Sequence, residues 1–590
     1  MEAVWRVYGK RADFREIGEK YNIDQVVARV IRNRDVVGDD AIRTYLRGTM
    51  ENTYAPELMA DMEKGCSILM AKIRDNKHIR IISDYDVDGV MSNYILIKGL
   101  LGAGAVVSYE IPDRMVDGYG INERIIRDAK ADGVDTIITC DNGIAAFSAI
   151  ELAKELGMTV IVTDHHQVPY EENGDKRIYN LVPADAVIDI QREDCTYPFK
   201  EICGAMVAYK FIRHLYSVMN LGWDDENKYI DMVAIATVCD VMELIDENRI
   251  FVKRGLKLLK NPQNIGLKAL LIANQIYGKD IYSYHLGFVI GPCINATGRL
   301  ESAKKGLELL LCDNENEAMK KAQELLELNT ARKEMTNLGV EEAVKIVEEK
   351  LRDDNILVVY MPELHESLAG IVAGRIRENY YKPVFVVTNG EGGILKGSGR
   401  SIEGYHMFDA LSQCKDLLLK YGGHKLAAGF SLEKEKLEEF IRMLNHNQNL
   451  TKEDLTPVVY LDVPMPMDYI TPKLVEDLKL LEPFGKGNEK PIFGQAGLGI
   501  KEAKLIGKDN KILKIFFQDS NGYITEGIEF NGNKLLDCIK MWFTDEECDK
   551  MLKGLPNNIK LDVAYYPDLN EFNGRQKIQV KPILYKKSAQ

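Results

Sequence analysis

Acidic and imidazole side chains recur directly after short apolar runs in this 590-residue sequence. The residues concerned are Asp84, Asp86, Asp88, Asp141, Asp164, His165, His166 and Asp240. Any one of these acids alone is also an ordinary helix cap or turn former. Together they would repel one another unless cations or protons compensated them. Oxygen and imidazole ligands without thiolates suit Mn²⁺ or Mg²⁺ better than a structural zinc, so the set predicts a divalent-metal site with ligands enough for two ions.

The apolar runs that precede these residues are spaced like the strands of a parallel sheet. Successive runs begin about 24 to 30 residues apart, which leaves room for one crossover helix each. The runs are His78–Ile82, Ala105–Ile111, Asp135–Thr139 and Thr159–Thr163. A further apolar run, Met232–Cys239, ends in Asp240, and we count it as another terminus at the same edge. Since ligands bind beyond the carboxyl ends of strands in doubly wound sheets, the acids and histidines are expected to converge there.

Composition narrows the class of protein. The 76 Lys and Arg against 90 Asp and Glu give a net charge of −14, which argues against duplex nucleic acid binding through a whole-protein positive field. A locally basic groove remains compatible with this charge. The ten cysteines form no Cys-x-x-Cys pair and predict reduced core thiols. Without a membrane-length apolar run or a signal-peptide pattern, the sequence predicts a cytoplasmic protein with no membrane partner.

Changes of periodicity divide the chain into five parts. They are an N-terminal helical segment (1–70), a first α/β domain (71–240), a helical connector (241–351), a second α/β domain (352–450) and a small β-barrel (455–590). The barrel prediction rests on alternating strands and on Asn-Gly turns at 521, 531 and 573. In the second α/β domain, Gly397–Ser401 and Tyr421–His424 offer backbone amides and polar side chains for a terminal phosphate. From composition alone, these segments are equally well read as tight glycine turns.

The ordered motifs resemble those of the DHH phosphoesterase superfamily, and within it the bacterial single-strand-specific 5′ to 3′ exonucleases. The segments that carry the resemblance are Asp84–Gly89, Ile111–Arg114, Gly118–Gly120, Asp141–Gly143, Asp164–His166, Tyr197–Gly204, Gly291–Leu300, Gly370–Arg375, Gly397–Ser401, Gly422–His424 and Pro483–Asn488. They span nearly the entire chain. The resemblance implies an α/β fold in which a DHH domain and a DHH-associated domain are joined by a long helical connector, followed by a C-terminal OB-type barrel.

The resemblance also implies a function and a set of site residues. The function is metal-dependent 5′ to 3′ hydrolysis of single-stranded DNA to mononucleotides in repair and recombination, with a single-strand-binding protein and a helicase as partners. The cofactor would be two Mn²⁺ ions, or Mg²⁺, held by Asp86, Asp88, Asp141, His165 and Asp240. Catalytic roles fall to His166, Asp84 and the bridging Asp141. Substrate contacts fall to Arg114, Arg299, Ser398, Arg400 and His424, with Ser398 and Arg400 as the clamp for a 5′-phosphate.

Two positions depart from the family pattern. Ile82 stands where many members have a histidine, so one metal would be held less tightly unless Asp84 helps. Cys293 stands where the family usually has arginine, which makes Arg299 the better phosphate contact. Two other functions remain open: a DHH phosphodiesterase acting on short oligonucleotides or cyclic dinucleotides, and a non-catalytic single-strand-binding scaffold. The barrel and connector count against the first, and the retained acids against the second.

Overall fold

The computed structural model describes residues 3–114, 117–118, 120–173, 176–507, 511–530, 533–572 and 575–589. The chain forms two compact units: unit 1 comprises 1–47, 452–484 and 489–590, and unit 2 comprises 48–451 and 485–488. The N-terminal segment expected over 1–70 is therefore shared between the two units. In the described part of the chain, no helix is both long enough and apolar enough to cross a membrane.

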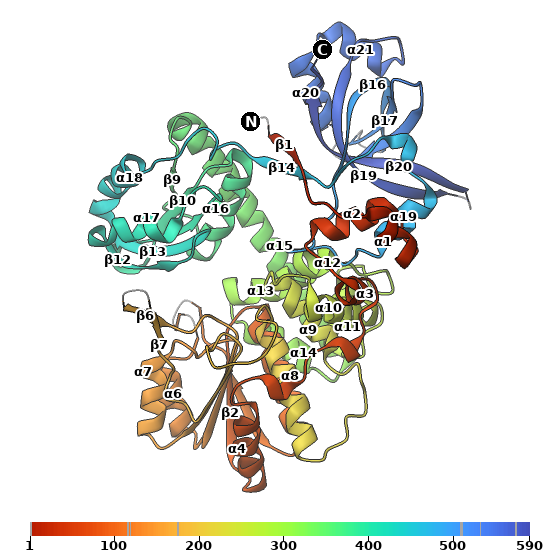
Figure 1. Ribbon diagram of the computed structural model, residues 1–590. Helices are drawn as coiled ribbons and strands as arrows, with labels where there is room; N and C mark the ends of the chain where they lie inside the picture. Colours follow the sequence, from red (N-terminus) through yellow and green to blue (C-terminus); the bar gives the residue numbers. More distant parts are fainter. Residues whose placement is uncertain are drawn as a thin grey trace. The chain divides into compact units, whose positions relative to one another are not determined.

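The first α/β domain of unit 2 is built on a five-stranded parallel sheet in the order β3-β2-β4-β5-β8. The strands are β2 (His78–Ser83), β3 (Val106–Glu110), β4 (Thr136–Cys140), β5 (Thr159–Asp164) and β8 (Ala186–Asp189). A hairpin of β6 (Tyr170–Asn173) and β7 (Lys176–Tyr179) lies between β5 and β8 in sequence. The crossover helices cover both faces of the sheet (Figure 1). The point between β2 and β4 where the strand order reverses is the expected ligand crevice.

Successive side chains along each strand point to opposite faces of this sheet, and apolar side chains occupy both faces. Ile137 faces a core with α6 (Glu123–Ala131) and α7 (Phe147–Glu155), whereas Ile138 faces the core on the other side. The helices of that second core include α4 (Met62–Arg74), α5 (Val87–Gly102), α8 (Gly204–Val218) and α9 (Ile230–Cys239), and helices of the connector join it. The doubly wound sheet expected from the sequence is thus confirmed.

The apolar run Met232–Cys239, which precedes Asp240, was expected to end at the edge of the sheet like the strands. That expectation is wrong for the run, although Asp240 itself reaches this edge. It forms the buried helix α9, which packs against α5, α8 and α10 (Asp246–Leu258). An element that is apolar on every side has no periodicity to separate a buried helix from a buried strand. Asp240 therefore reaches the sheet edge from the end of a helix.

The connector consists of short helices followed by one long helix. These are α10, α11 (Ile265–Ala273), α12 (Ser283–His285), the π-helical turn η3 (Leu286–Ile290), α13 (Gly291–Leu300), α14 (Lys304–Leu311), α15 (Glu315–Ile346) and a final π-turn η4 (Val347–Leu351). The helical connector expected over 241–351 is confirmed as helical, but it is divided into several helices, with one break between α14 and α15. There Asn314 caps α15 by accepting a hydrogen bond from the Glu317 N–H at 3.0 Å.

The second α/β domain contains a mixed five-stranded sheet in the order β12-β13-β11-β10-β9. Its elements are β9 (Leu357–Tyr360), α16 (Glu366–Tyr380), β10 (Val384–Asn389), β11 (Ile394–Arg400), α17 (Met407–Gln413), β12 (Leu418–Gly423), β13 (Ala427–Glu433) and α18 (Leu437–His446). The segment expected as a glycine-rich phosphate loop or turn forms most of β11, which pairs with β10 and β13. Its backbone amides are thus used by the sheet. Glycine is needed at 397 because a Cβ there would lie 2.1 Å from the Phe430 ring.

Unit 1 is a closed barrel to which the N-terminal helices are attached. Its strands are β15 (Val463–Pro464), β16 (Phe493–Ile506), β17 (Ile512–Gln518), β18 (Ile524–Glu529), β19 (Lys560–Phe572) and β20 (Arg575–Lys587), with β16 paired to both β17 and β19. Helices α19 (Pro472–Lys479), α20 (Asn533–Trp542) and α21 (Asp545–Leu552) accompany them. Gly522, with φ of 85°, forms the β17–β18 turn; the Asn-Gly pairs at 531 and 573, like Tyr119 of an earlier motif, lie outside the described residues.

The first 47 residues share the hydrophobic core of the barrel. Strand β1 (Val4–Val7) pairs in parallel with β14 (Val458–Leu461). The helices α1 (Phe14–Tyr21), α2 (Gln25–Asn33) and α3 (Asp39–Arg47) follow β1. Their Val27 and Ile31 lie in one buried cluster with Leu474 and Phe493.

Candidate metal centre and phosphate pocket

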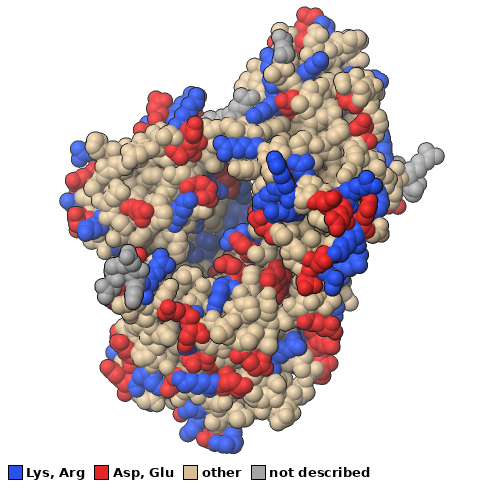
Figure 2. Space-filling view, viewed as in Figure 1, with Lys and Arg blue, Asp and Glu red and all other residues tan. Residues whose placement is uncertain are grey.

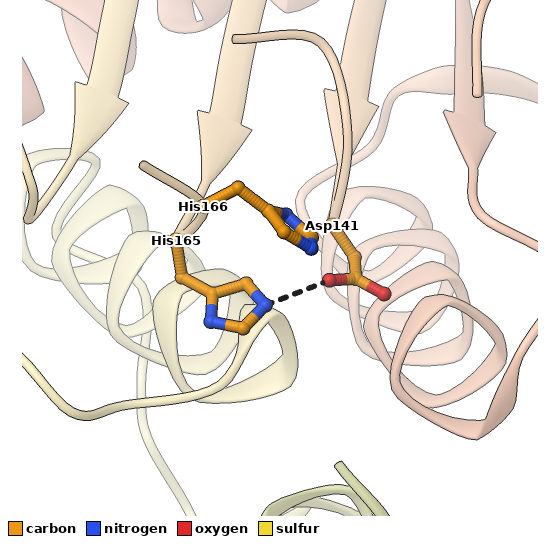
Figure 3. A group of neighbouring side chains, drawn as sticks. All are labelled: Asp141, His165 and His166. Atoms are coloured by element: carbon orange, nitrogen blue, oxygen red, sulfur yellow. Dashed lines mark hydrogen bonds and ion pairs between the residues drawn. The ribbon is translucent and has the colours of Figure 1, made fainter. Parts of the chain in front are cut away.

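The acids and histidines predicted from the sequence meet at one edge of the parallel sheet. Strand ends, or the start of α5 directly after β2, contribute all of them except Asp240, which follows α9. Figure 3 shows His165 and His166 beside Asp141 at neighbouring strand ends. Three groups have ligand atoms within 4.8 Å of one another, namely Asp141–His165–His166, Asp88–His165–Asp240 and Asp84–Asp86–Asp141.

His165 lies at the centre of this cluster. Its Nε2 is 3.0 Å from Asp141 Oδ1, 3.6 Å from Asp88 Oδ2 and 3.7 Å from Asp240 Oδ2. One imidazole nitrogen thus faces carboxylates that follow β2, β4 and α9 at once. Burial lowers the pKa of His165, which favours the neutral ring that can act as a metal ligand.

Two of the carboxylates are held by helix N-termini. Asp88 accepts hydrogen bonds from the N–H groups of Gly204 at 2.6 Å and Ala205 at 2.7 Å, the first residues of α8. Asp86 caps α5 and accepts a hydrogen bond from the Gly89 N–H at 3.1 Å. Unpaired amides and the helix dipole favour a negative charge at both places. These contacts fix the two side chains whether or not an ion is bound.

Asp164 orients both histidines, a role that the sequence analysis did not assign. Its Oδ1 accepts hydrogen bonds from His166 Nδ1 at 2.7 Å and from the His165 N–H at 2.8 Å, and its Oδ2 accepts one from the Ile144 N–H at 2.9 Å. Burial alone would lower the pKa of His166, but the hydrogen bond and charge of Asp164 raise it to about 9. The contact with Asp164 thus favours the protonated ring of His166, which can donate a hydrogen bond.

The charges of Asp141, Asp240 and Asp84 indicate a cation-binding site. Burial, followed by the charges of Asp88 and Asp86, raises the pKa of Asp141 well above its usual range and that of Asp240 to about 8. Asp84 Oδ1 is buried and has no hydrogen-bond partner among the described residues. So many acids in one buried place require compensating positive charge. Divalent cations with oxygen and imidazole ligands meet that requirement.

Thiolate ligation does not suit the site. Cys140 lies at the end of β4 and Cys203 just before α8, and both are fully buried. Burial and the charge of Asp88 raise the pKa of both thiols well above the usual range. They remain protonated, so the donor set is that of a Mn²⁺ or Mg²⁺ site.

A cation-lined pocket of about 640 Å³ is formed by residues of both α/β domains and the connector. Among the described residues that line it, five are cationic and one is acidic: Arg114, Arg299, Lys396, Arg400 and Lys420, with Glu366. Lys396 pairs with Glu366 at 2.7 Å, which leaves four cations and no further lining acid. Burial and then the neighbouring Arg114 and Arg332 lower the pKa of Arg299 to about 10. This excess of positive charge suits a phosphate. Over the outer surface in Figure 2, by contrast, basic and acidic side chains are interspersed.

The polar side chains of the pocket are held by short contacts. Arg299 Nη1 donates to the Ser367 carbonyl at 2.7 Å, and Arg400 Nη1 donates to the Gly399 carbonyl at 2.8 Å and to Ser398 Oγ at 3.4 Å. Gly370 of α16 lets the helix approach, since a Cβ there would lie 2.9 Å from both Arg400 Nη2 and Ser398 Oγ.

The pocket adjoins the acidic cluster through Tyr85. This residue lies between Asp84 and Asp86, and the guanidinium of Arg114 is 5.2 Å from the centre of its ring. Lys486 is a second basic neighbour that the sequence analysis did not single out. Its carbonyl accepts a hydrogen bond from the Leu244 N–H at 2.8 Å, and its charge opposes the rise in the pKa of Asp240. The sequence signal for it was the motif Pro483–Asn488.

Three residues singled out from the sequence lie elsewhere. His424 is exposed after β12 and is not among the residues that line the pocket. Ile82 is buried in the core beneath α6 and α7. Cys293 is buried with its Sγ 3.4 Å from Asn329 Nδ2, so it also lies outside the pocket.

Comparison with known proteins agrees with this arrangement. The DHH family, N-terminal domain, matches residues 78–237, the DHHA1 domain matches 353–449, and the RecJ OB domain matches 461–582. The fold and the acidic site thus define a phosphoesterase of the DHH class.

Relatives identify the family within that class. The single-stranded-DNA-specific exonuclease RecJ of Bacillus subtilis is 32% identical over 572 residues, covering 96% of this chain and 68% of the relative. The single-stranded-DNA-specific exonuclease RecJ of Escherichia coli is 34% identical over 549 residues, covering 88% of this chain and 89% of the relative. The crystal structure of RecJ in complex with Mn²⁺ from Thermus thermophilus matches all of this chain and 80% of that one, with a TM-score of 0.81 and 27% identity. The chain belongs to the RecJ family.

Proposed function

We propose that this protein is a divalent-metal-dependent exonuclease that hydrolyses single-stranded DNA from its 5′ end and releases mononucleotides in DNA repair and recombination. The observation that carries the proposal is the contact between two sites of opposite charge. Buried acids and histidines lie on one side of Tyr85, and a pocket rich in arginine lies on the other. The names of the relatives support the same activity.

We assign metal binding to Asp86, Asp88, Asp141, His165 and Asp240, with Asp84 in support. The number of ligands favours two ions, Mn²⁺ or alternatively Mg²⁺. When bound, such ions supply Lewis acidity that activates water and neutralises phosphate oxygens. The protein itself keeps Asp88 oriented through the α8 amides and keeps His166 protonated through Asp164. His166 then donates a hydrogen bond to an oxygen of the scissile phosphate or of the leaving group.

We assign recognition of the 5′-phosphate to Ser398 and Arg400, with Arg114 and Arg299 alongside. A clamp for a terminal phosphate next to the metal ligands would place the first phosphodiester bond at the acidic cluster and so set the polarity. Arg400→Ala is expected to reduce cleavage of a 5′-phosphorylated strand more than that of a 5′-hydroxyl strand. Equal losses on the two strands would contradict this role for Arg400.

One digestion tests the activity, the polarity and the metal requirement together. A single strand labelled at one end is incubated with Mn²⁺, Mg²⁺ or a chelator, and the products are resolved by length. The expected result is mononucleotide release from the 5′ end with metal and none with chelator. Preference for a dinucleotide over a long strand would favour the small-substrate alternative, and strand binding without cleavage would favour the scaffold. Association with a single-strand-binding protein and a helicase is a further part of the proposal and rests on the family resemblance.

A further inference from the structure

Two aromatic side chains are exposed side by side on the connector. Tyr284 and Phe288 are 63% and 62% exposed, and their rings stack with centroids 5.1 Å apart and planes 22° apart. They are four residues apart across α12 and the π-turn η3, so they lie on one helical face. Single π-turns are frequent at functional sites. A stacked aromatic pair left in solvent is a surface suited to another flat ring.

The pair lies close to the helix end that carries a proposed metal ligand. The Cys239 thiol lies 3.4 Å from the Leu286 carbonyl, and a Cβ on Gly287 would lie 3.8 Å from Val238. Thus η3 packs directly against the last turn of α9, and Asp240 follows that turn.

Helix α13 connects the same place with the phosphate pocket. It begins at Gly291, directly after η3, and carries Arg299 near its other end. Its ten residues span about 15 Å at 1.5 Å each. That length corresponds to roughly four nucleotides or fewer, given a spacing of about 3.4 Å for stacked nucleotides. A strand with its 5′-phosphate beside Arg299 therefore needs only a few nucleotides to reach the aromatic pair.

Charge along this part of the chain favours nucleic acid as the occupant. From 249 to 290 the sequence has seven basic residues and one acidic residue, whereas the whole chain has a net charge of −14. The basic residues are Arg249, Lys253, Arg254, Lys257, Lys260, Lys268 and Lys279, and the acid is Asp280. Of these, Arg249 is buried, and Lys260 and Lys268 pair with Asp280 and Glu315 at 2.8 and 3.3 Å. Lys279 is the one whose charge acts on His285, the residue that lies against Tyr284. Aromatic faces combined with basic side chains bind single strands by stacking bases while compensating phosphates.

We propose that Tyr284 and Phe288 form a base-stacking platform for single-stranded DNA, a few nucleotides to the 3′ side of the bond being cut. The platform would hold the strand while its 5′ end enters the phosphate pocket. This inference rests on the proposed nuclease function and adds a substrate subsite to it.

Kinetics on strands of different length test the platform. Tyr284→Ala combined with Phe288→Ala is expected to raise KM for a 5′-phosphorylated 20-mer roughly 10-fold or more. Cleavage of a dinucleotide, which is too short to reach the platform, should be unchanged. Tyr284→Phe combined with Phe288→Trp, which keeps two aromatic faces, should stay near wild type. Leu338→Ala is the control, because Leu338 is 67% exposed on α15 and takes no part in the proposed site.

A second readout separates stacking from a structural effect. A 20-mer carrying 2-aminopurine three to five nucleotides from the 5′ end is bound to the protein in chelator, and its fluorescence is measured. Quenching by wild type but not by the double alanine variant is expected. Unchanged KM on the 20-mer, equal losses on both substrates, or equal quenching by both proteins would overturn the platform. Failure of the nuclease proposal itself would instead appear as an inactive wild type.

Discussion

Gly370→Ala should impair the phosphate clamp without weakening the fold. A Cβ at this position would lie 2.9 Å from Arg400 Nη2 and from Ser398 Oγ, about 0.5 Å inside ordinary contact, so both groups must move. A hydrogen bond to a charged group contributes about 1.5–3 kcal/mol. Losing one such bond to a 5′-phosphate corresponds to roughly a 10- to 150-fold decrease in kcat/KM. In the helix itself, replacing glycine by alanine is favourable by about 1 kcal/mol.

The helix provides a matched control for this substitution. Gly374 is one turn further along α16, and a Cβ there meets nothing within 4 Å. Gly374→Ala should therefore gain the same helical stability and keep full activity. Both variants are assayed on 5′-phosphorylated and 5′-hydroxyl strands, and their melting temperatures are compared. If Gly370→Ala kept the wild-type preference for a 5′-phosphate, or lost both substrates equally, the clamp assignment would be refuted.

Three further substitutions probe the metal cluster and the core of unit 2. Asp141→Ala should abolish nuclease activity while circular dichroism and the melting temperature in chelator show an intact fold; residual Mn²⁺-dependent cleavage would remove Asp141 from the ligand set. Burial raises the pKa of Asp231 to about 6 in the folded protein, above its ordinary value in the unfolded chain. The folded protein therefore loses stability as the pH rises from about 4 through 6, where only the unfolded chain ionises this carboxyl freely. Asp231→Asn should therefore raise the melting temperature at pH 8 but much less at pH 4.5, and an equal change at both would contradict this. Lys210→Met should cost about 3–5 kcal/mol in chemical unfolding, since it leaves Glu247, now 3.0 Å from the Lys210 ammonium, buried without its cation; adding Glu247→Gln should restore part of the loss.

The convergence of the acids could be predicted because it depends on local rules. Apolar runs separated by crossover helices define a parallel sheet, and residues that follow its strands must meet at one edge. Asp84, Asp141 and His165 are placed by this argument alone. Asp240 also reaches the cluster, but from α9, since an element apolar on every side gives no periodicity to identify it.

Other features depend on contacts that one sequence does not display. Asp164 precedes two histidines, and only the fold shows that its carboxylate orients the second one. Gly397 was expected in a turn or phosphate loop, yet it lies in β11. The position is glycine because Phe430 of the neighbouring strand occupies the space of a side chain. His424 shares a motif with residues of the pocket but lies outside its lining, since the chain turns after β12.

The core shared by the two ends of the chain also constrains how the protein is made. Val27 and Ile31 are synthesised among the first residues, but their partners Leu474 and Phe493 leave the ribosome more than 400 residues later. At about 5–20 residues per second, the apolar face of α2 waits roughly 20–90 s for its partners. The enzyme's catalytic half can be complete in that time while its N-terminal helices are still exposed to chaperones and proteases.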